Sequence, residues 1–283
     1  MGLHFPGVAL VTGAGSGIGR ATALLFAKEG CSRIAIADLN KSCVDELRDE
    51  INGQRKGVEV LSLHVDITSE ESVDSMVAET TRVLGRVDYA CNVAGVLLPG
   101  PTDEVAVASF DLQQRVNLRG TWLCQRAQIK QMLKQEPLHA EDSRVPARGA
   151  IANVASMCAL MAYDHLPAYC ASKHGILGFT RSDGLRYAKN GIRINAICPG
   201  VIRTAMLGDV PDSDVGMDVQ AMVQDMAAGR LGLPEEVAEC IVWITSGRAS
   251  LVTASTLSPN GGMCLVYPSS PVDTYMHLGM IGA

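Results

Sequence analysis

Short runs of apolar residues recur along the chain, and a longer stretch with amphipathic spacing follows most of them. The runs are rich in Val, Ile, Leu and Ala, which is typical of buried strands. They predict seven strands, at residues 8–11, 33–37, 58–64, 87–92, 150–154, 193–197 and 256–257. The amphipathic stretches predict helices at residues 18–29, 42–52, 69–84, 117–133, 168–189 and 235–245. Strands that are apolar throughout and alternate with helices indicate a parallel sheet with helices on both faces.

The alternation of strands and helices continues without a linker, so the sequence predicts one doubly wound α/β domain over residues 1–283. Two segments depart from the rhythm. Residues 136–149 contain two prolines and predict an exposed loop. Residues 200–230 are rich in Gly, Asp and Met and follow the carboxyl end of a strand. Because doubly wound sheets bind ligands at that edge, the second segment predicts a flexible flap over a pocket.

Composition narrows the classes of partner. The net charge of −6, without a basic stripe, disfavours binding to nucleic acid. No apolar run approaches the ~20 residues of a membrane span. The nine cysteines are scattered, odd in number and free of Cys-x-x-Cys spacing, which favours free thiols in a reducing compartment and no metal site. We therefore expect a cytoplasmic protein that binds neither nucleic acid nor membranes.

The stretch VTGAGSGIGR, residues 11–20, holds glycines at 13, 15, 17 and 19 directly after the first predicted strand. The amino end of the helix that follows carries unpaired N–H groups, which attract phosphate. Glycines let the backbone turn tightly and approach a diphosphate without a Cβ atom in the way. The position of this turn therefore predicts a dinucleotide site.

The pattern Thr-Gly-x-x-x-Gly-x-Gly resembles the short-chain dehydrogenase/reductase family, and the resemblance extends along nearly the whole chain. Further motifs follow in the order and spacing of that family: Asn92-Val93-Ala94-Gly95, Asn117 in RVNLRG, Ser156, Tyr169-Cys170-Ala171-Ser172-Lys173, Pro199-Gly200, and SPNGG at 258–262. The resemblance implies a Rossmann fold and an NAD(P)-dependent oxidoreductase that acts on secondary alcohols or ketones.

The resemblance assigns the catalytic residues Asn117, Ser156, Tyr169 and Lys173. Tyr169 would be the acid/base, and Lys173 lies one helical turn further on the same face. The ammonium of Lys173, together with an oxidised nicotinamide, is expected to lower the pKa of the phenol. Ser156 would bind the reacting oxygen. Asn117 would bend its helix around a water that connects Lys173 to solvent.

The expected cofactor-binding residues lie mainly at the carboxyl ends of the predicted strands. They are Gly13, Ser16, Gly17, Ile18, Gly19, Asp38, Asp66, Ile67, Asn92, Ala94, Gly95, Tyr169, Lys173, Pro199, Gly200, Val201, Ile202 and Thr204. A carboxylate at Asp38 would accept hydrogen bonds from the adenosine ribose and repel an added phosphate. Ser16 and Leu39 stand where NADP-preferring relatives carry a basic residue, so we expect NAD rather than NADP. Asp66 would contact adenine or cap the following helix.

The expected substrate pocket is apolar. It includes Met157, Cys158, Ala159, Leu160 and Met161 after the catalytic serine, and Met206, Leu207, Met217, Met222 and Met226 in the flap. Methionines adapt to irregular apolar shapes. They favour a bulky, mostly apolar substrate such as a steroid, terpenoid, polyketide or alkaloid, or else they pack the flap against the body. Tyr163 is assigned to substrate contact or packing.

The sequence also bears on the oligomeric state and on alternative functions. The family resemblance implies a homo-oligomer, a tetramer or dimer, through the helices at 117–133 and 168–189. The extension at 263–283 either covers a neighbouring pocket or interface, or frays. A catalytically silent dinucleotide-sensing protein is one alternative function. An epimerase, dehydratase or cyclase with the same cofactor is another.

Overall fold

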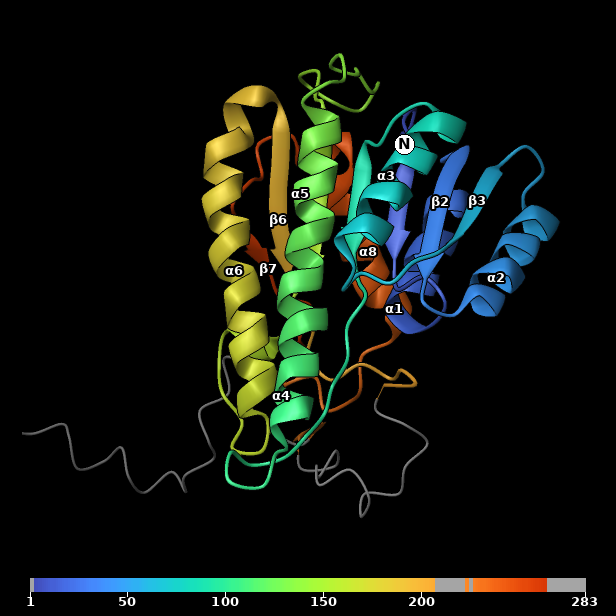
Figure 1. Ribbon diagram of the computed structural model, residues 1–283. Coiled ribbons are helices and arrows are strands. Elements are labelled where there is room, and N and C mark those ends of the chain that lie inside the picture. Colours follow the sequence, from blue (N-terminus) through green and yellow to red (C-terminus); the bar gives the residue numbers. More distant parts are fainter. Residues whose placement is uncertain (1–2, 207–221, 224–225, 264–283) are drawn as a thin grey trace, which may run out of the picture.

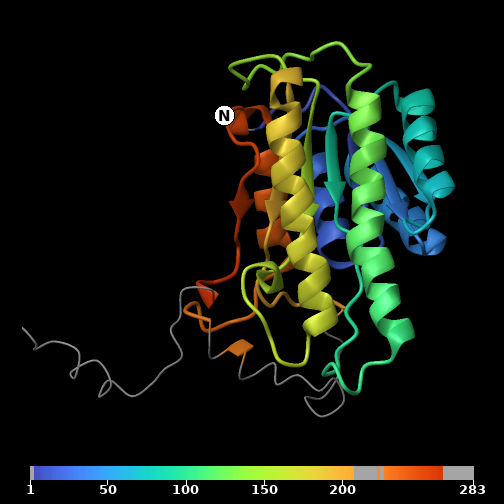
Figure 2. The same ribbon diagram turned by 60° about the vertical axis from the view of Figure 1, so that its left-hand side comes forward.

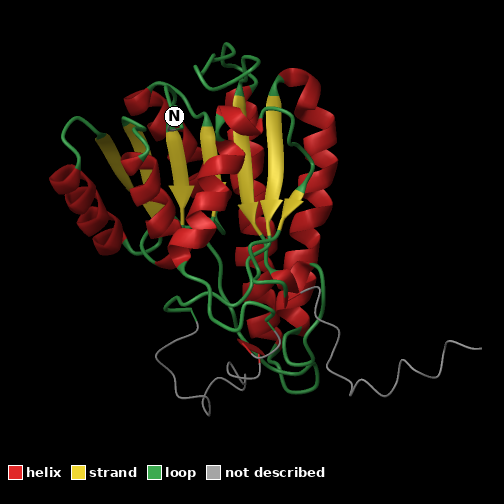
Figure 3. Ribbon diagram, turned by 180° about the vertical axis from the view of Figure 1, so that it is seen from behind, coloured by secondary structure: helices red, strands yellow, loops and turns green. Residues whose placement is uncertain are grey.

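The computed structural model describes residues 3–206, 222–223 and 226–263, and they form a seven-stranded sheet in the order β3-β2-β1-β4-β5-β6-β7. The strands are β1 (Ala9–Thr12), β2 (Arg33–Asp38), β3 (Glu59–His64), β4 (Tyr89–Asn92), β5 (Gly149–Val154), β6 (Ile192–Ile197) and β7 (Thr256–Leu257). Every neighbouring pair is parallel. The predicted doubly wound α/β fold is therefore confirmed, and Figure 3 shows the strand arrowheads along one edge of the sheet.

Helices cover both faces of the sheet (Figure 1). The longer ones are α1 (Gly17–Lys28), α2 (Lys41–Gln54), α3 (Glu70–Leu84), α5 (Thr121–Met132), α6 (Pro167–Tyr187) and α8 (Pro234–Thr245). The shorter ones are α4 (Val107–Gln113), η1 (Gln114–Gly120), η2 (Met157–Ala159), η3 (Ala188–Asn190) and η4 (Gly247–Ala249). Among the described helices, none combines the length and the apolar character that crossing a lipid bilayer requires.

The burial of β1 explains why its sequence is apolar at every position. Ala9 and Val11 pack into the core beneath α1, α2 and α8, whereas Leu10 packs into the core beneath α3 and α5. All three side chains are fully buried. Since successive side chains of a strand point to opposite faces, a sheet covered on both sides needs an unbroken apolar run.

The helix expected at residues 117–133 begins ten residues earlier. α4, η1 and α5 run on as one long helix from Val107 to Met132, and this helix lies side by side with α6 in Figures 1 and 2. η1 is a π-helical segment, a geometry that is often found at functional sites. Its polar residues interrupt the apolar spacing, which hid the first two turns from the sequence pattern.

The structure describes the whole of the first irregular segment and part of the second. In the predicted loop at 136–149, Leu138 and Ala147 form an isolated antiparallel bridge, and Ala140 is buried. In the predicted flap, residues 207–221 and 224–225 lie outside the described residues, as does most of the predicted extension, residues 264–283.

Candidate active site

A cleft of about 420 Å³ lies at the carboxyl edge of the sheet. Every residue predicted to bind the cofactor lines it, except Asn92. Three of the four predicted catalytic residues, Ser156, Tyr169 and Lys173, also line the cleft. The sequence motifs therefore converge on one concave site, in the place where doubly wound sheets bind ligands.

The glycine-rich turn joins β1 to α1 at one end of the cleft. Gly13 has a φ of 67°, and a Cβ atom there would lie 2.7 Å from the Cα atom of Ala94. A Cβ atom on Gly19 would lie 2.0 Å from the carbonyl oxygen of Gly13. Ser16 is the N-cap of α1 and makes no side-chain capping hydrogen bond. The close backbone packing and the amino end of α1 fit the diphosphate of a dinucleotide.

Asp38 ends β2 beside this turn. One carboxylate oxygen accepts a hydrogen bond from the Gly15 amide at 2.9 Å, and the other accepts from the Asn40 amide at 2.9 Å. Each carboxylate oxygen has two acceptor sites, so Asp38 is held in place and retains capacity for ligand hydroxyls. This geometry fits the predicted contact with a ribose.

Asp66 follows β3 and lines the cleft. Its Oδ1 atom accepts hydrogen bonds from the backbone amide and the hydroxyl of Thr68, both at 2.8 Å. The helix that follows is capped by Ser69, whose side chain accepts a hydrogen bond from Ser72. Of the two predicted roles for Asp66, capping the helix is therefore wrong, and contact with a bound nucleotide stays a prediction.

Ser156, Tyr169 and Lys173 lie together at the other end of the cleft. Ser156 follows β5 and is the N-cap of η2, where its hydroxyl accepts a hydrogen bond from the Cys158 amide at 3.1 Å. Hydrogen bonding with Ser156 is one of the influences on the pKa of Tyr169, so the two side chains lie close together. The Nζ atom of Lys173 donates to the Val154 carbonyl at 3.0 Å and lies 5.4 Å from the centre of the Tyr169 ring.

Burial dominates the electrostatics of this group. It lowers the pKa of the Lys173 ammonium to about 8. It also raises the pKa of Tyr169 above its ordinary value, and the hydrogen bond with Ser156 opposes this only in part. Desolvation of the phenolate is the largest effect on the pKa of Tyr169 in the protein without a nicotinamide. The expected lowering of this pKa by Lys173 together with an oxidised nicotinamide stays a prediction. Tyr169 is a neutral phenol here, able to donate a proton.

Asn117 lies behind the cleft in η1, fully buried. Its amide accepts from the Val96 N–H and donates to the Val96 carbonyl, both at 2.8 Å, and donates to the Ser172 hydroxyl at 3.3 Å. A Cβ atom on Gly95 would lie 3.2 Å from Oδ1 of Asn117 and 3.6 Å from Nζ of Lys173. Glycine at 95 therefore leaves space between the two side chains, as the predicted relay from Lys173 would need.

The side chain of Asn92 binds other buried side chains and does not line the cleft. Its side chain exchanges two hydrogen bonds with Gln128, at 3.0 and 2.8 Å, and donates a third to Asn153 at 2.9 Å. All three side chains are buried. The amide of Asn92 thus joins β4 to α5 and β5, and it does not face the cleft where a cofactor contact was expected.

Only some of the residues expected at the substrate end line the cleft. Met157, Cys158, Met206 and Met222 line the cleft. Ala159, Leu160, Met161 and Met226 are described and do not line it, while Leu207 and Met217 lie outside the described residues. Tyr163 packs its hydroxyl against the sulfur atoms of Met157 and Met161, at 3.8 and 3.9 Å.

Several lining residues were not among the predicted binding or catalytic residues, although Thr12, Leu39 and Val93 stand within the patterns that predicted the site. They are Thr12, Ala37, Leu39, Val65, Thr68, Val93, Val96, Leu97, Val116, Val154, Ala155 and Leu166. Many of them neighbour a predicted residue at the end of a strand, so extending each motif by one position would have found them. Leu97 and Leu166 gave no such signal, because their places depend on how two loops pack together.

Known proteins resemble this chain over most of its length. Residues 13–264 match a family model described as enoyl-(acyl carrier protein) reductase. The short-chain dehydrogenase srdC of Neurospora crassa is 37% identical over 273 residues, which cover 93% of this chain and 98% of the relative. An NAD-dependent glycerol dehydrogenase of Listeria innocua is 35% identical over 255 residues, covering 90% and 92%.

Among solved structures, a variant of actinorhodin polyketide ketoreductase with NADPH is similar, with a TM-score of 0.81 and 31% identity. The match covers 91% of this chain and 97% of that one. These likenesses span the glycine turn, the sheet and the Ser-Tyr-Lys group together. The chain belongs to the short-chain dehydrogenase/reductase family.

Proposed function

We propose that the protein transfers a hydride between NAD(H) and the secondary alcohol or ketone group of a bulky, mostly apolar small molecule. The observation that carries the proposal is one cleft with the glycine turn at one end and Ser156, Tyr169 and buried Lys173 at the other. Its carboxylate, ammonium and backbone N–H groups fit a dinucleotide along its length.

The residues divide the chemistry of ketone reduction between them. A bound nicotinamide supplies the hydride. The Ser156 hydroxyl donates a hydrogen bond to the carbonyl oxygen, where negative charge develops. Tyr169, kept neutral by burial, donates its proton to that same oxygen. The Lys173 ammonium would hold the ribose and stabilise the phenolate that forms. The absence of a Cβ atom at Gly95 leaves space between Lys173 and Asn117.

The preference for NAD rests on Asp38. Its fixed carboxylate at the end of β2 would repel a 2′-phosphate, and neighbouring Leu39 is exposed and uncharged. The relatives leave the question open, since one is NAD-dependent and one was solved with NADPH. We expect the Kd for NADH to lie at least ~10-fold below that for NADPH, and Asp38→Asn to reduce this ratio. Tighter binding of NADPH by the natural chain would contradict the preference.

The substrate class follows from the wall at the catalytic end of the cleft. Leu97, Met157, Leu166, Met206 and Met222 line it with apolar side chains. Steroid-, terpenoid-, polyketide- and alkaloid-like skeletons all present the apolar surface that such a wall buries.

The proposed function is tested by following the absorbance of NADH, at saturating NADH, after a ketone is added. We expect oxidation of NADH with the bicyclic ketone 1-tetralone and with acetone, and a lower KM for the bicyclic ketone. Cofactor binding without turnover of any ketone or alcohol would favour a dinucleotide sensor. Product without net change in NADH would favour an epimerase, dehydratase or cyclase.

We also propose a cytoplasmic homo-oligomer, a tetramer or dimer built through α5 and α6. Trp122 on α5 and Leu185 on α6 are large apolar side chains that are exposed in the single chain. Cys31, Cys91, Cys124, Cys158 and Cys170 are buried free thiols, as fits a reducing compartment. Light scattering after size-exclusion chromatography measures the assembly, and a monomer at micromolar concentration would contradict it.

A further inference from the structure

Gln113 is a buried glutamine that none of the sequence motifs includes. It ends α4 with no exposed surface. Its Oε1 atom accepts a hydrogen bond from the Leu98 amide at 3.1 Å, and its Nε2 atom donates to the Leu98 carbonyl at 3.0 Å. One side chain therefore satisfies both backbone polar groups of a residue in the loop after β4.

Asn117, one turn further along the same helix, likewise binds both the amide and the carbonyl of Val96. Two amide side chains thus hold the backbone on both sides of Leu97, as a neighbouring strand would hold alternate residues. Leu97 lines the cleft and packs against the apolar cluster that contains Met157 and Leu166.

The far end of the loop is fixed as well. The Gly100 amide donates to the His165 carbonyl at 2.9 Å, next to Leu166. The loop that carries Leu97 is therefore tied to α4 and η1 on one side and to the segment before α6 on the other. Removal of the Gln113 amide would free its central part while leaving Ser156, Tyr169 and Lys173 in place.

We propose that Gln113 is a positioning residue that determines substrate size, because it holds Leu97 in the apolar wall of the cleft. This assignment rests on the proposed function. A buried amide is costly unless it is fully hydrogen-bonded, and here both of its bonds go to the backbone of Leu98, next to Leu97. Gln113 touches neither the reacting atoms nor the cleft, so it acts through Leu97.

Gln113→Leu tests the assignment, since leucine keeps the side chain's approximate volume and removes both hydrogen bonds. We expect the KM for 1-tetralone to rise at least ~10-fold while kcat stays within about twofold, as for lost binding of an unreactive part of the substrate. The KM for acetone and the Kd for NADH should change by less than about twofold, because neither depends on contact with Leu97.

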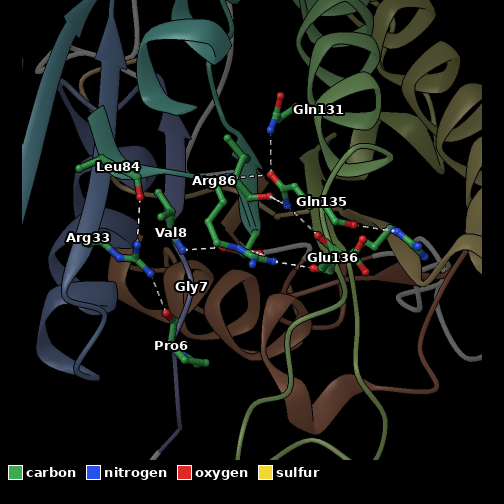
Figure 4. A network of polar contacts seen from close by, with 12 residues as sticks. Pro6, Gly7, Val8, Arg33, Leu84, Arg86, Gln131, Gln135 and Glu136 are labelled. Atoms are coloured by element: carbon green, nitrogen blue, oxygen red, sulfur yellow. Dashed lines mark hydrogen bonds and ion pairs between the residues drawn. The ribbon is translucent and has the colours of Figure 1, made fainter. Parts of the chain in front are cut away.

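Gln135 provides a matched control at the opposite edge of the sheet (Figure 4). It is also buried, and it binds both backbone groups of one residue, Val87, at 2.8 and 2.9 Å. Gln135 also donates to the Arg148 carbonyl at 3.1 Å, so Gln135→Leu should lower the Tm at least as much as Gln113→Leu. It should leave the KM for 1-tetralone unchanged. An equal rise in KM for both variants would overturn the assignment, because the effect would then follow stability alone.

Gln113→Glu adds a pH readout. A neutral carboxyl group can accept from the Leu98 amide and donate to its carbonyl, whereas a carboxylate has no proton to donate. Burial and the hydrogen bond that the neutral carboxyl donates both raise its pKa above the ordinary ~4.3. The KM of this variant for 1-tetralone should therefore rise as the pH passes this raised pKa, and that of the natural chain should not. A KM for Gln113→Glu that follows the natural chain at every pH would overturn the assignment.

The same measurements separate the two proposals. A natural chain that reduces neither ketone would overturn the proposed function, and with it the role of Gln113. An active natural chain with an unchanged KM in Gln113→Leu would overturn the role of Gln113 alone.

Discussion

Asp88 at the amino edge of the sheet and Asp38 at the carboxyl edge show two uses of a carboxylate. Asp88 is almost fully buried, accepts from the Val8 amide at 2.9 Å and pairs with both the Nε and a terminal nitrogen of Arg86. Asp38 is half-buried and accepts two backbone amides, which fix it beside a cleft. The first carboxylate is enclosed by protein donors, and the second borders the cleft.

The arginines of the amino edge follow the same rule as Asp88. Arg33 donates to the carbonyls of Pro6 and Leu84, and Arg86 donates to that of Glu136 (Figure 4). Arg193 donates to carbonyls at the end of α8, including those of Thr245 and Ser246. These contacts join segments that are distant in sequence, so the amino edge stabilises the fold.

The contrast teaches that residue type alone does not mark function in this fold. Both edges hold buried cations and amides that bind backbone groups. At the carboxyl edge, Ser156, Tyr169 and Lys173 border an open cleft, whereas at the amino edge the described polar groups mainly bind one another. Substitutions at the two edges should therefore separate activity from stability.

Gly19→Ala gives the largest expected effect at the carboxyl edge. The added Cβ atom would lie 2.0 Å from the Gly13 carbonyl, so the turn must open. We expect NADH to bind at least ~100-fold more weakly, a loss of roughly 3 kcal/mol. Gly53→Ala in α2 is the control, because nothing lies within 4 Å of its added Cβ atom. Fluorescence titration measures both, and wild-type affinity in Gly19→Ala would contradict the role of the turn.

Asp88→Ala tests the amino edge. The change leaves the Val8 amide and the Arg86 guanidinium without their carboxylate, which should cost roughly 4 kcal/mol of unfolding free energy. Turnover per folded molecule should stay unchanged. Denaturant unfolding and steady-state kinetics measure the two quantities. Glu79→Ala, which breaks the exposed ion pair with Arg82, should change neither. Loss of turnover in folded Asp88→Ala would break the separation between the edges.

Lys173 gives an effect on stability that depends on pH. Below about pH 8 its amine is charged in both the folded and the unfolded chain. Between about 8 and its ordinary pKa of 10.5 the folded chain has lost the proton and the unfolded chain keeps it. The unfolded chain then binds more protons, so stability increases with pH through this window.

Comparison with Lys173→Met isolates that contribution. The free energy of unfolding of the natural chain, relative to the variant, should rise by about 3 kcal/mol from pH 8 to 10.5. Denaturant unfolding at several pH values measures it. A difference that stays constant with pH would show that the folded lysine has its ordinary pKa.

Much of the fold could be predicted because it depends on local patterns. β1 to β7 are short apolar runs, and the glycines of the first turn all lie within seven residues of sequence, at alternate positions from 13 to 19. The start of α4 could not be read this way. Gln113, Gln114 and Arg115 interrupt the apolar face, and the reason for a buried Gln113 is the loop at Leu98.

The candidate site shows the same limit. Ser156, Tyr169 and Lys173 could be assigned because they match the family's motifs in order and spacing along the chain. Asn92 shares its motif with residues of the cleft, yet its amide meets Gln128 on α5, 36 positions away. The raised pKa of Tyr169 depends on burial by several elements, which no local pattern reveals.

The central claim is that Tyr169 exchanges a proton with the substrate while the hydride moves. Single-turnover oxidation of bound NADH by a ketone tests it most directly, in Tyr169→Phe and in the control Tyr163→Phe. We predict that Tyr169→Phe transfers the hydride at least ~10²-fold more slowly and binds NADH as tightly as the natural chain, and that Tyr163→Phe keeps the natural rate. A natural rate in Tyr169→Phe would contradict the account.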